Sequence, residues 1–291
     1  MSLSSDRCQG FTVRLFLPNG DPEGVKVIEK SNWTGLGLVI PRSLYATERE
    51  RAPLHQGAGI YFLVGTDEES SLPKIYVGEG DPVAPRLDAH AQNKDFWTHV
   101  VIFTSKDQNL NKAHVQYLES RLLDLAEKAN RSILDNRNSP QLPSLSDADI
   151  ADSAGFLENI LLCLPILGYP FFDVVDTLRT VSHDFFLESK GILAQGHETS
   201  GGFAVTKGSQ AVKKEAPSLY GNGRMMRKIL IEKGVLVDAG TFYEFRQNYE
   251  FSSPSMAAGV VLGRSANGRT EWKNKDGKTL KAFQEEGLHA K

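Results

Sequence analysis

Two apolar runs that carry glycine and tyrosine lie close together in the first third of the chain and constrain its fold most. The first is GAGIYFLVG, residues 57–65, and the second is KIYVGEG, residues 74–80. A polar loop, residues 67–71, separates them. Runs of this length that are rich in aromatic and β-branched residues, joined by a short polar loop, are typical of a β-hairpin. We therefore expect two adjacent strands here.

The residues that follow predict a helix, a strand and a second helix. Residues 82–92 predict a helix with Asp81 as N-cap and Pro82 at its first position. Residues 97–105 (WTHVVIFTS) predict a third strand. Residues 110–129 predict a long amphipathic helix, because apolar residues recur at helical spacing. Its apolar stripe consists of Val115, Leu118, Leu122, Leu125 and Ala129.

The segments on either side of this core also have readable patterns. Three short β-type runs, residues 11–17, 25–29 and 35–40, precede it, and an Asn-Gly turn separates the first two. A short polar helix is expected over residues 41–51. After the core we expect a helix over residues 147–167, a strand-like segment over 171–187, and then a mixed C-terminal part. The elements expected in that part are a strand at 202–208, a helix at 218–233, strands at 235–237 and 241–248, a helix begun by Ser252 to Ser255, and a hairpin within 263–280 that carries an Asn-Gly and an Asp-Gly turn.

These patterns predict an α+β chain with four parts. The expected divisions are an N-terminal β-rich accessory segment (1–50), a core domain (51–145), a helical and strand connector (146–200) and a small C-terminal α/β domain (201–291). The boundary before the last part is placed in the His-, Thr- and Gly-rich residues 197–202. A chain of 291 residues is long enough for two domains of ordinary size.

Composition indicates a globular protein outside the membrane. The chain is 40% hydrophobic and 24% charged, and no apolar run reaches the length of a membrane span. The N-terminal residues lack the cationic segment and apolar core of a secretory signal. The two cysteines, Cys8 and Cys163, have no metal-ligand spacing. We therefore expect a cytoplasmic protein with reduced thiols and no membrane partner.

Charge is distributed unevenly along the chain. Residues 201–291 carry 15 Lys and Arg against 9 Asp and Glu, a balance of +6, whereas residues 1–200 carry 18 against 27, a balance of −9. A basic C-terminal part is compatible with a nucleic-acid partner or with an ordinary solvated surface. The candidate phosphate-binding residues are Lys207, Lys213, Lys214, Arg224, Arg227, Lys228, Arg264 and Arg269, with Tyr243 or Trp272 as candidates for base stacking. For Trp272 a place in the core is the alternative.

The core contains side chains suited to phosphodiester cleavage. Tyr61 and Tyr76 lie on neighbouring expected strands, and a tyrosine of lowered pKa can position water or relay its proton. Arg86 and His90 are one helical turn apart, and a guanidinium matches the geometry of a phosphate. Glu119 borders the apolar stripe of the long helix, where a carboxylate can hold a divalent cation, although an ion pair with Lys112 or Arg121 is the alternative.

The core also resembles a known family. The motifs are GIY at residues 59–61, YVG at 76–78, then Arg86 and Glu119, and together they resemble the GIY-YIG nuclease family over about residues 57–138. The resemblance implies a small mixed sheet flanked by helices and cleavage of nucleic acid with Mg²⁺ or Mn²⁺. It implies an active site of Tyr61, Tyr76, Arg86 and His90, with Glu119 as metal ligand. It also implies an asparagine, for which Asn136 is preferred over Asn130.

The same resemblance leaves two questions open. Many members have a lysine after the second motif, where this chain has Glu79, so a non-catalytic nucleic-acid- or protein-binding module is the alternative to a DNA endonuclease. Nothing in the sequence distinguishes DNA from RNA as the substrate. Residues 251–280 resemble a domain of unknown function that is often appended to bacterial GIY-YIG proteins, which adds no role of its own.

Overall fold

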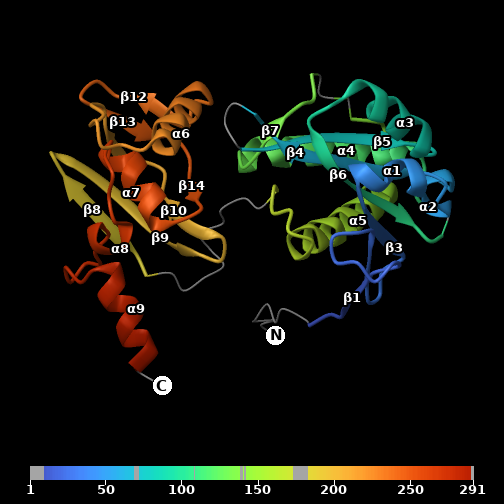
Figure 1. The fold of residues 1–291 in the computed structure, drawn as a ribbon, viewed down its shortest axis with the longest axis horizontal. Coiled ribbons are helices and arrows are strands. Elements are labelled where there is room, and N and C mark those ends of the chain that lie inside the picture. Colours follow the sequence, from blue (N-terminus) through green and yellow to red (C-terminus); the bar gives the residue numbers. More distant parts are fainter. Residues whose placement is uncertain are drawn as a thin grey trace. The chain divides into compact units, whose positions relative to one another are not determined.

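The computed structural model describes residues 10–68, 72–107, 109–137, 140, 142–172 and 183–289, except that the side chains of 287–289 are not described. The chain divides into two compact units, Met1–Val174 and Val175–Lys291, and each is described by itself (Figure 1). Both units combine sheets with flanking helices, so the expected α+β class is confirmed. Among the described residues, no helix has the length and apolarity needed to cross a lipid bilayer.

A seven-stranded mixed sheet forms the first unit, with strand order β1-β2-β3-β6-β4-β5-β7. Neighbouring strands are antiparallel except for β5 and β7, which are parallel. The strands are β1 (Val13–Phe16), β2 (Lys26–Lys30), β3 (Gly35–Pro41), β4 (Gly59–Thr66), β5 (Pro73–Gly80), β6 (Trp97–Ser105) and β7 (Ile133–Leu134). The expected hairpin is therefore present as β4 and β5, and it lies inside a larger sheet.

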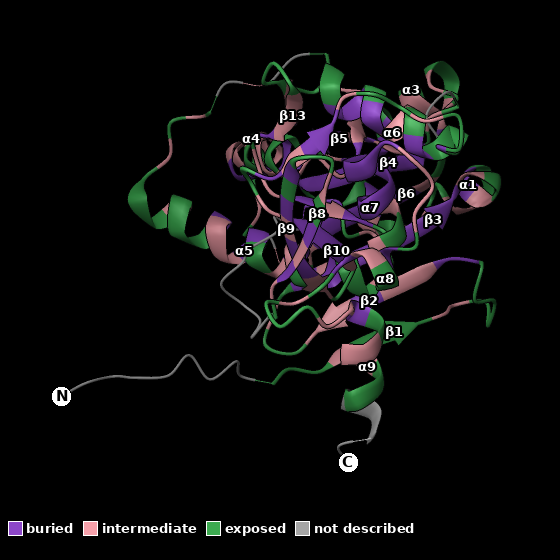
Figure 2. Cartoon of the chain, turned by 90° about the vertical axis from the view of Figure 1, so that its left-hand side faces the viewer, coloured by how far each residue is buried: buried purple, intermediate pink, exposed green. Residues whose placement is uncertain are grey.

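Helices cover both faces of this sheet. One face packs against α1 (Arg42–Glu48), α2 (Ala52–His55) and α3 (Ala84–Asn93), and the other packs against α4 (Lys112–Ala129) and α5 (Asp147–Ile166). Because the sheet is covered twice, the central strands are buried on both sides, which explains their continuous apolar runs. Figure 2 shows β4 almost entirely buried and most of β6 buried, whereas β1 at the edge is largely exposed.

The N-terminal strands belong to the core sheet, whereas the sequence predicted a separate accessory segment over residues 1–50. Strand β3 pairs with β6 over its whole length, from Gly35 opposite Ser105 to Pro41 opposite His99. The apolar residues of β6 face both helical layers, so β6 requires a paired strand on each side to satisfy its backbone. Strand β4 supplies one neighbour and β3 the other.

Helix ends follow their capping residues. The side chain of Asn111 accepts hydrogen bonds from the backbone N–H groups of Ala113 and His114 and thereby starts α4. Ser146 caps α5 in the same way. The expected start of α3 is wrong by two residues: Val83 is its N-cap and Pro85, not Pro82, lies in its first turn.

The second unit contains two small antiparallel sheets that enclose one core with α6 and α7. The strand orders are β14-β10-β9-β8 and β11-β13-β12. The elements are β8 (Phe185–Ser189), β9 (Ile192–Thr199), β10 (Gly202–Val205), β11 (Gln210–Val212), α6 (Gly221–Glu232), β12 (Leu236–Asp238), β13 (Phe242–Phe245), β14 (Tyr249–Phe251), α7 (Pro254–Leu262), α8 (Gly268–Glu271) and α9 (Leu280–His289). The boundary expected at residues 197–202 lies within the first of these sheets, between β9 and β10.

Two further expectations for this unit can be compared with the structure. Ser253 caps α7 and Pro254 occupies its first turn, as predicted. The hairpin expected within residues 263–280 is present only at its second turn, where Lys273 pairs with Thr279 in an antiparallel bridge around Asp276-Gly277. The expected Asn-Gly turn is wrong, because Asn267 caps the short helix α8 instead. The strand-like segment expected at 171–187 falls mainly outside the described residues, and only its end is seen in β8.

Candidate active site

The two motif tyrosines project from the same face of the hairpin. In the β4–β5 register Tyr61 lies opposite Gly78, and Tyr76 lies opposite Leu63, so both side chains point toward α3. Their ring centroids are 6.2 Å apart. Gly78 makes room for them, since a Cβ at this position would lie 2.5 Å from the Tyr61 hydroxyl oxygen. The glycine of the YVG motif is therefore required by the packing of the GIY tyrosine.

Helix α3 adds His90 and Arg86 to the tyrosines. The Tyr61 hydroxyl and Nε2 of His90 are hydrogen-bonded at 2.9 Å, and the imidazole packs edge-on against the Tyr76 ring with 4.7 Å between centroids. Arg86, one turn earlier on α3, is exposed. Its guanidinium has no hydrogen-bond or ion-pair partner within the described part of the chain. It is therefore free to meet an incoming anion.

Burial keeps the side chains of Tyr61, Tyr76 and His90 uncharged at neutral pH. Desolvation raises the pKa of both phenols, strongly for Tyr61, while the nearby Arg86 partly offsets the effect. Desolvation, together with the neighbouring Lys94 and Arg86, lowers the pKa of His90 to about 4. A neutral imidazole can accept a proton, whereas the phenols hold theirs firmly in the absence of a bound cation.

Glu119 reaches the same region from α4. Its carboxylate lines a pocket of about 590 Å³ together with Tyr76, His90 and Asn136. Neither ion pair considered as its alternative role forms, because Lys112 binds Glu79 and Arg121 approaches Asp124. In the described part of the structure, the Glu119 carboxylate has no hydrogen-bond or ion-pair partner.

The unpaired carboxylate is electrostatically strained. Burial and then the negative charge of Glu79 raise the pKa of Glu119 to about 7, although the positive charges of Arg86 and Lys112 act in the opposite direction. A group in this state gains most from a positive ligand, because the cation replaces both the lost hydration and the missing partner. Glu119 is thus the acidic side chain of the pocket best suited to a metal ion.

A divalent cation of the magnesium type fits this donor set. Hard cations prefer oxygen ligands, and Mg²⁺ is commonly held by one or two carboxylates with several waters and substrate phosphate oxygens. Among the described residues, no group of three or more His, Cys, Asp and Glu side chains is placed to share a metal. The Glu119 carboxylate in an open pocket matches a cation that keeps most of its water shell.

The Asn136 side chain is hydrogen-bonded to the backbone of strand β5. Its side-chain oxygen accepts from the Val77 N–H at 3.0 Å, and its side-chain nitrogen donates to the Val77 carbonyl at 2.7 Å. The amide therefore extends the ladder between β5 and β7 by one residue. Asn136 lines the pocket, but both of its hydrogen-bonding groups are engaged with the backbone, so it fixes the position of β5 beside Tyr76.

One pair near the site was not predicted. The Lys112 ammonium lies 2.7 and 2.6 Å from the two carboxylate oxygens of Glu79, which is buried. Glu79 and Lys112 are 33 residues apart, and a pair so distant carries no local sequence signal. At the position after YVG, where the resemblance to GIY-YIG nucleases led to the expectation of a lysine, this chain has an acid that binds a lysine from α4.

Basic side chains also border the pocket. Lys94 lies 4.5 Å from the centroid of the Tyr76 ring and forms an ion pair with Asp135, which Lys74 also approaches at 3.2 Å. Arg137 is exposed and lines the same pocket. Lys94, Asp135 and Arg137 were not predicted as part of the site, because their position beside Tyr76 depends on the parallel pairing of β5 and β7.

The basic residues predicted in the C-terminal part do not all lie at the surface. Arg227 is 1% exposed and its guanidinium donates to Glu215 and to the carbonyl groups of Val212 and Val260, so its expected contact with phosphate is wrong. Other members are exposed or partly exposed but paired with acids: Lys213 with Asp238, Arg224 with Glu215, Lys228 with Glu232 and Arg264 with Glu271.

Three of the predicted basic residues keep exposed side chains without an acidic partner among the described residues. They are Lys207, Lys214 and Arg269, the last of which donates to Gln284. The aromatic candidates are packed: Trp272 is fully buried against Phe203, and the Tyr243 ring lies beneath Lys213 and Arg227. Trp272 is therefore a core residue, which was the alternative to a role in base stacking.

Comparison with known proteins identifies one part of the chain. Residues 185–284 match the family described as domain of unknown function (DUF4357). The second unit contains a DUF4357 domain. Its matched range runs from the start of β8 into α9, so it includes β8 and β9, which the sequence placed in a connector.

The other comparisons give no match. No curated protein and no solved structure matches this chain, and no match to the GIY-YIG family was found. Inference about the first unit therefore rests on its geometry.

Proposed function

We propose that the first unit is a metal-dependent endonuclease that hydrolyses phosphodiester bonds of nucleic acid, with DNA as the expected substrate, in the manner of GIY-YIG enzymes. The supporting observation is that Tyr76, His90 and Glu119, from β5, α3 and α4, line one open pocket. Arg86, without a partner, and Tyr61, bonded to His90, lie beside it. These are the side-chain types that phosphodiester hydrolysis needs.

In this proposal the positive groups bind and orient the phosphate. Arg86 presents its guanidinium to the non-bridging oxygens, and the exposed Arg137, which lines the pocket, contacts a neighbouring phosphate of the strand. Glu119 holds one Mg²⁺ or Mn²⁺, which supplies charge neutralisation at the phosphate and the leaving oxygen when bound. Asn136 keeps β5, and with it Tyr76, in place.

Proton transfer is assigned to the two tyrosines and His90. Tyr76 lines the pocket and is the phenol placed to contact the attacking water. Tyr61 is buried and bonded to His90, whose lowered pKa leaves it neutral and able to accept a proton. Since the phenol pKa values are raised in the protein alone, Tyr76 requires the positive charge of a bound cation and Arg86 before it can act as a base.

The experiment compares cleavage of supercoiled plasmid and of a structured RNA by wild type and by Glu119→Gln, with and without Mg²⁺ or Mn²⁺. We expect metal-dependent cleavage that falls about 100-fold or more in Glu119→Gln. Glu127→Gln, an exposed carboxylate on the same helix, is the matched control and should cleave like wild type. Cleavage by Glu119→Gln at the wild-type rate would remove the proposed role of this carboxylate.

One observation favours the alternative of a non-catalytic nucleic-acid- or protein-binding module. Glu79 uses the charge of Lys112, so the site has less free positive charge than the family pattern implies. In that case wild type and Glu119→Gln would bind nucleic acid without cutting it, with or without metal. The plasmid experiment, read together with a gel-shift measurement, separates the two functions.

For the second unit we propose added, sequence-independent affinity for nucleic acid through Lys207 and Lys214. Removing one lysine that binds a phosphate lowers the slope of log affinity against log salt by about one. The double variant Lys207→Gln/Lys214→Gln should therefore bind DNA more weakly and with a smaller salt slope. The matched control is Lys213→Gln/Lys228→Gln, because both of these lysines are already paired with acids. An unchanged slope in the first double variant would exclude these contacts.

A further inference from the structure

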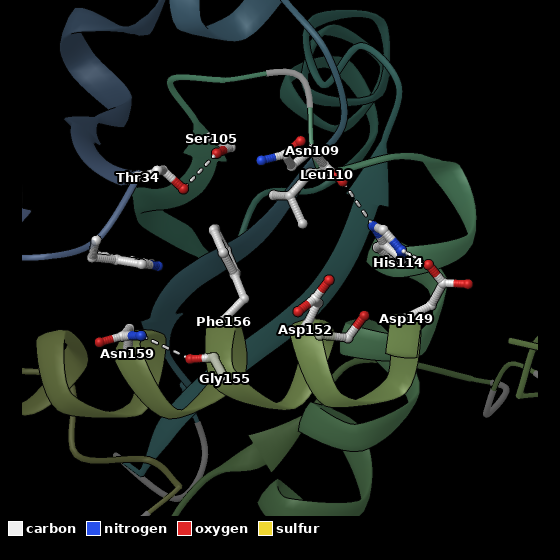
Figure 3. A pocket seen from close by; sticks show the side chains of 12 residues that line it. Thr34, Ser105, Asn109, Leu110, His114, Asp149, Asp152, Gly155, Phe156 and Asn159 are labelled. Atoms are coloured by element: carbon white, nitrogen blue, oxygen red, sulfur yellow. Dashed lines mark hydrogen bonds and ion pairs between the residues drawn. The ribbon is translucent and has the colours of Figure 1, made fainter. Parts of the chain in front are cut away.

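A second pocket of the first unit lies between α5 and the start of α4 (Figure 3). Its volume is about 550 Å³, and its wall comes from the β2–β3 connection, the end of β6, the loop that follows it, and the two helices. It shares no lining residue with the pocket that contains Tyr76 and Glu119. It is therefore a separate feature that the proposed cleavage reaction does not use.

Two polar groups of this wall are buried without a hydrogen bond. The Ser153 hydroxyl, on a residue only 1% exposed, and the Trp33 indole N–H have no hydrogen-bond partner among the described residues. A buried polar group left unpaired has lost its hydration without gaining a protein partner, so most such groups in proteins are hydrogen-bonded. These two point to a ligand that offers a donor to Ser153 and an acceptor to Trp33.

The charge of the pocket selects a cation. Asp149 and Asp152 lie one turn apart on α5, and no Lys or Arg is among the described lining residues. Asp149 is already engaged, with Nε2 of His114 at 3.2 Å and with the Ser146 hydroxyl at 2.7 Å. The Asp152 carboxylate has no partner in the described structure, and Figure 3 shows it between Phe156 and Asp149, directed away from the α5 axis. A phosphate would be repelled here.

An apolar surface completes the wall. The Trp33 and Phe156 rings pack at 5.0 Å between centroids, and Leu110 faces Phe156 (Figure 3). Such a surface suits the aliphatic stem of a long side chain, and aromatic faces also attract cations. The required ligand therefore combines a cationic end, an aliphatic stem and a hydrogen-bond acceptor.

We propose that this pocket binds an arginine-like ligand: a guanidinium on an aliphatic stem with a carbonyl group at the other end. The planar guanidinium has five N–H donors, enough to serve both the Asp152 carboxylate and the Ser153 hydroxyl. The carbonyl accepts from the Trp33 N–H. A free arginine derivative and an arginine side chain of a polypeptide share this chemistry. The ligand is a cation, so it differs from the nucleic acid of the proposed function, and neither proposal depends on the other.

The test follows the indole N–H signals in NMR spectra of the ¹⁵N-labelled full chain. Trp33→Phe assigns the signal of Trp33, and Trp272, whose indole donates to Pro254 in the second unit, is the internal reference. The probes are Nα-acetyl-arginine amide, its neutral analogue Nα-acetyl-citrulline amide, and agmatine, which lacks the carbonyl. We expect a saturable shift of the Trp33 signal with the acetyl-arginine amide, a weaker response to agmatine, and none with the citrulline compound. A response to agmatine as strong as that to the acetyl-arginine amide would overturn the proposed contact between the Trp33 N–H and a carbonyl group, because agmatine has no carbonyl.

Variants on α5 identify the contacts. Asp152→Asn should weaken binding about fivefold, the usual effect of losing one partly exposed ion pair. The separate variant Ser153→Ala should also weaken binding, because it removes the hydroxyl that accepts from the guanidinium. Glu158→Gln removes an exposed carboxylate from the same helix outside the pocket and should bind like wild type. The proposal is overturned by equal shifts from the arginine and citrulline compounds, by unchanged affinity in Asp152→Asn, or by the absence of a saturable shift of Trp33.

Discussion

The Tyr61 hydroxyl on β4 lies 2.9 Å from Nε2 of His90 on α3, so the buried phenol and the imidazole form one hydrogen-bonded unit. Tyr76 packs against the same imidazole. The unit connects the interior of the sheet with the pocket that contains Glu119. A proton leaving the pocket through His90 would therefore affect Tyr61 as well.

Removal of either partner of this unit should have the same effect on cleavage. We expect Tyr61→Phe and His90→Ala each to lower kcat by about 100-fold, and the double variant to be no slower than either, because groups that act together are not additive. Cleavage rates at saturating substrate measure this. Tyr45→Phe is the control, since the Tyr45 hydroxyl also bonds to α3, at Asp88, but lies outside the pocket. Additive losses would show that the two residues act independently.

The pH dependence of cleavage should follow Glu119. Its pKa of about 7, raised by burial and then by Glu79, means that the carboxylate is protonated below neutral pH and cannot hold a cation there. Metal-dependent activity should therefore rise as pH increases through 7. Glu79→Gln removes the negative neighbour and lowers the pKa of Glu119, so cleavage at pH 6 should increase about fivefold for a change of one pKa unit.

A pH–rate profile of wild type and Glu79→Gln measures this shift. Glu48→Gln removes a carboxylate that is paired with Arg51 elsewhere in the first unit and should leave the profile unchanged. A Glu79→Gln profile that moves to higher pH would contradict the assignment of Glu119 as the titrating group.

Gly78→Ala should disrupt the tyrosine pair. The added Cβ would lie 2.5 Å from the Tyr61 hydroxyl oxygen and 2.8 Å from Cε1 of Tyr76, so at least one ring must move. We expect a decrease of about 1–3 kcal/mol in the free energy of unfolding, as for other overpacked sites, and loss of cleavage. Urea denaturation measures the stability. Gly155→Ala, with no atom within 4 Å of the new Cβ in helix α5, should instead stabilise the chain by about 1 kcal/mol.

Arg227→Ala should destabilise the DUF4357 domain. It removes a buried guanidinium that donates to the Val212 and Val260 carbonyl groups, and it leaves Glu215 with Arg224 as its remaining cationic partner. Leaving a buried carbonyl group without its donor typically costs about 1–3 kcal/mol. Hydrogen exchange in the second unit reports the change. The exposed Lys214→Gln should leave exchange unaffected, and equal protection in both variants would contradict a structural role for Arg227.

Local patterns predicted much of this fold. Strands β4, β5 and β6 and helices α4 and α5 lie close to their expected positions, because period, capping and apolar length are local properties. Ambiguous local signals failed: the Asn267-Gly268 pair can form a hairpin turn or begin a helix, and the structure has the helix. The three N-terminal strands lie close to their expected positions, but their expected separation from the core is wrong, since pairing of β3 with β6 joins residues as far apart along the chain as Gly35 and Ser105.

The candidate site shows the same limit. The spacing of the motifs predicted five site residues: Tyr61, Tyr76, Arg86, His90 and Glu119. It did not predict what each of their side chains contacts. That Glu119 lacks a partner follows from the pairing of Lys112 with Glu79, which only the packing of α4 on β5 determines. Arg227 was predicted at the surface because it is charged, yet it is buried, and backbone carbonyl groups and Glu215 accept its hydrogen bonds.

The pairing of β3 with β6 has a practical consequence for the isolation of the segment that carries the GIY and YVG motifs. A fragment limited to residues 57–138 would leave one side of β6 with unsatisfied backbone groups and an apolar surface, the features that cause strands to associate between molecules. It would also lose α5, which covers one face of the sheet. A recombinant fragment should therefore keep residues 10–172 together, because a shorter fragment would aggregate before the proposed cleavage could be measured.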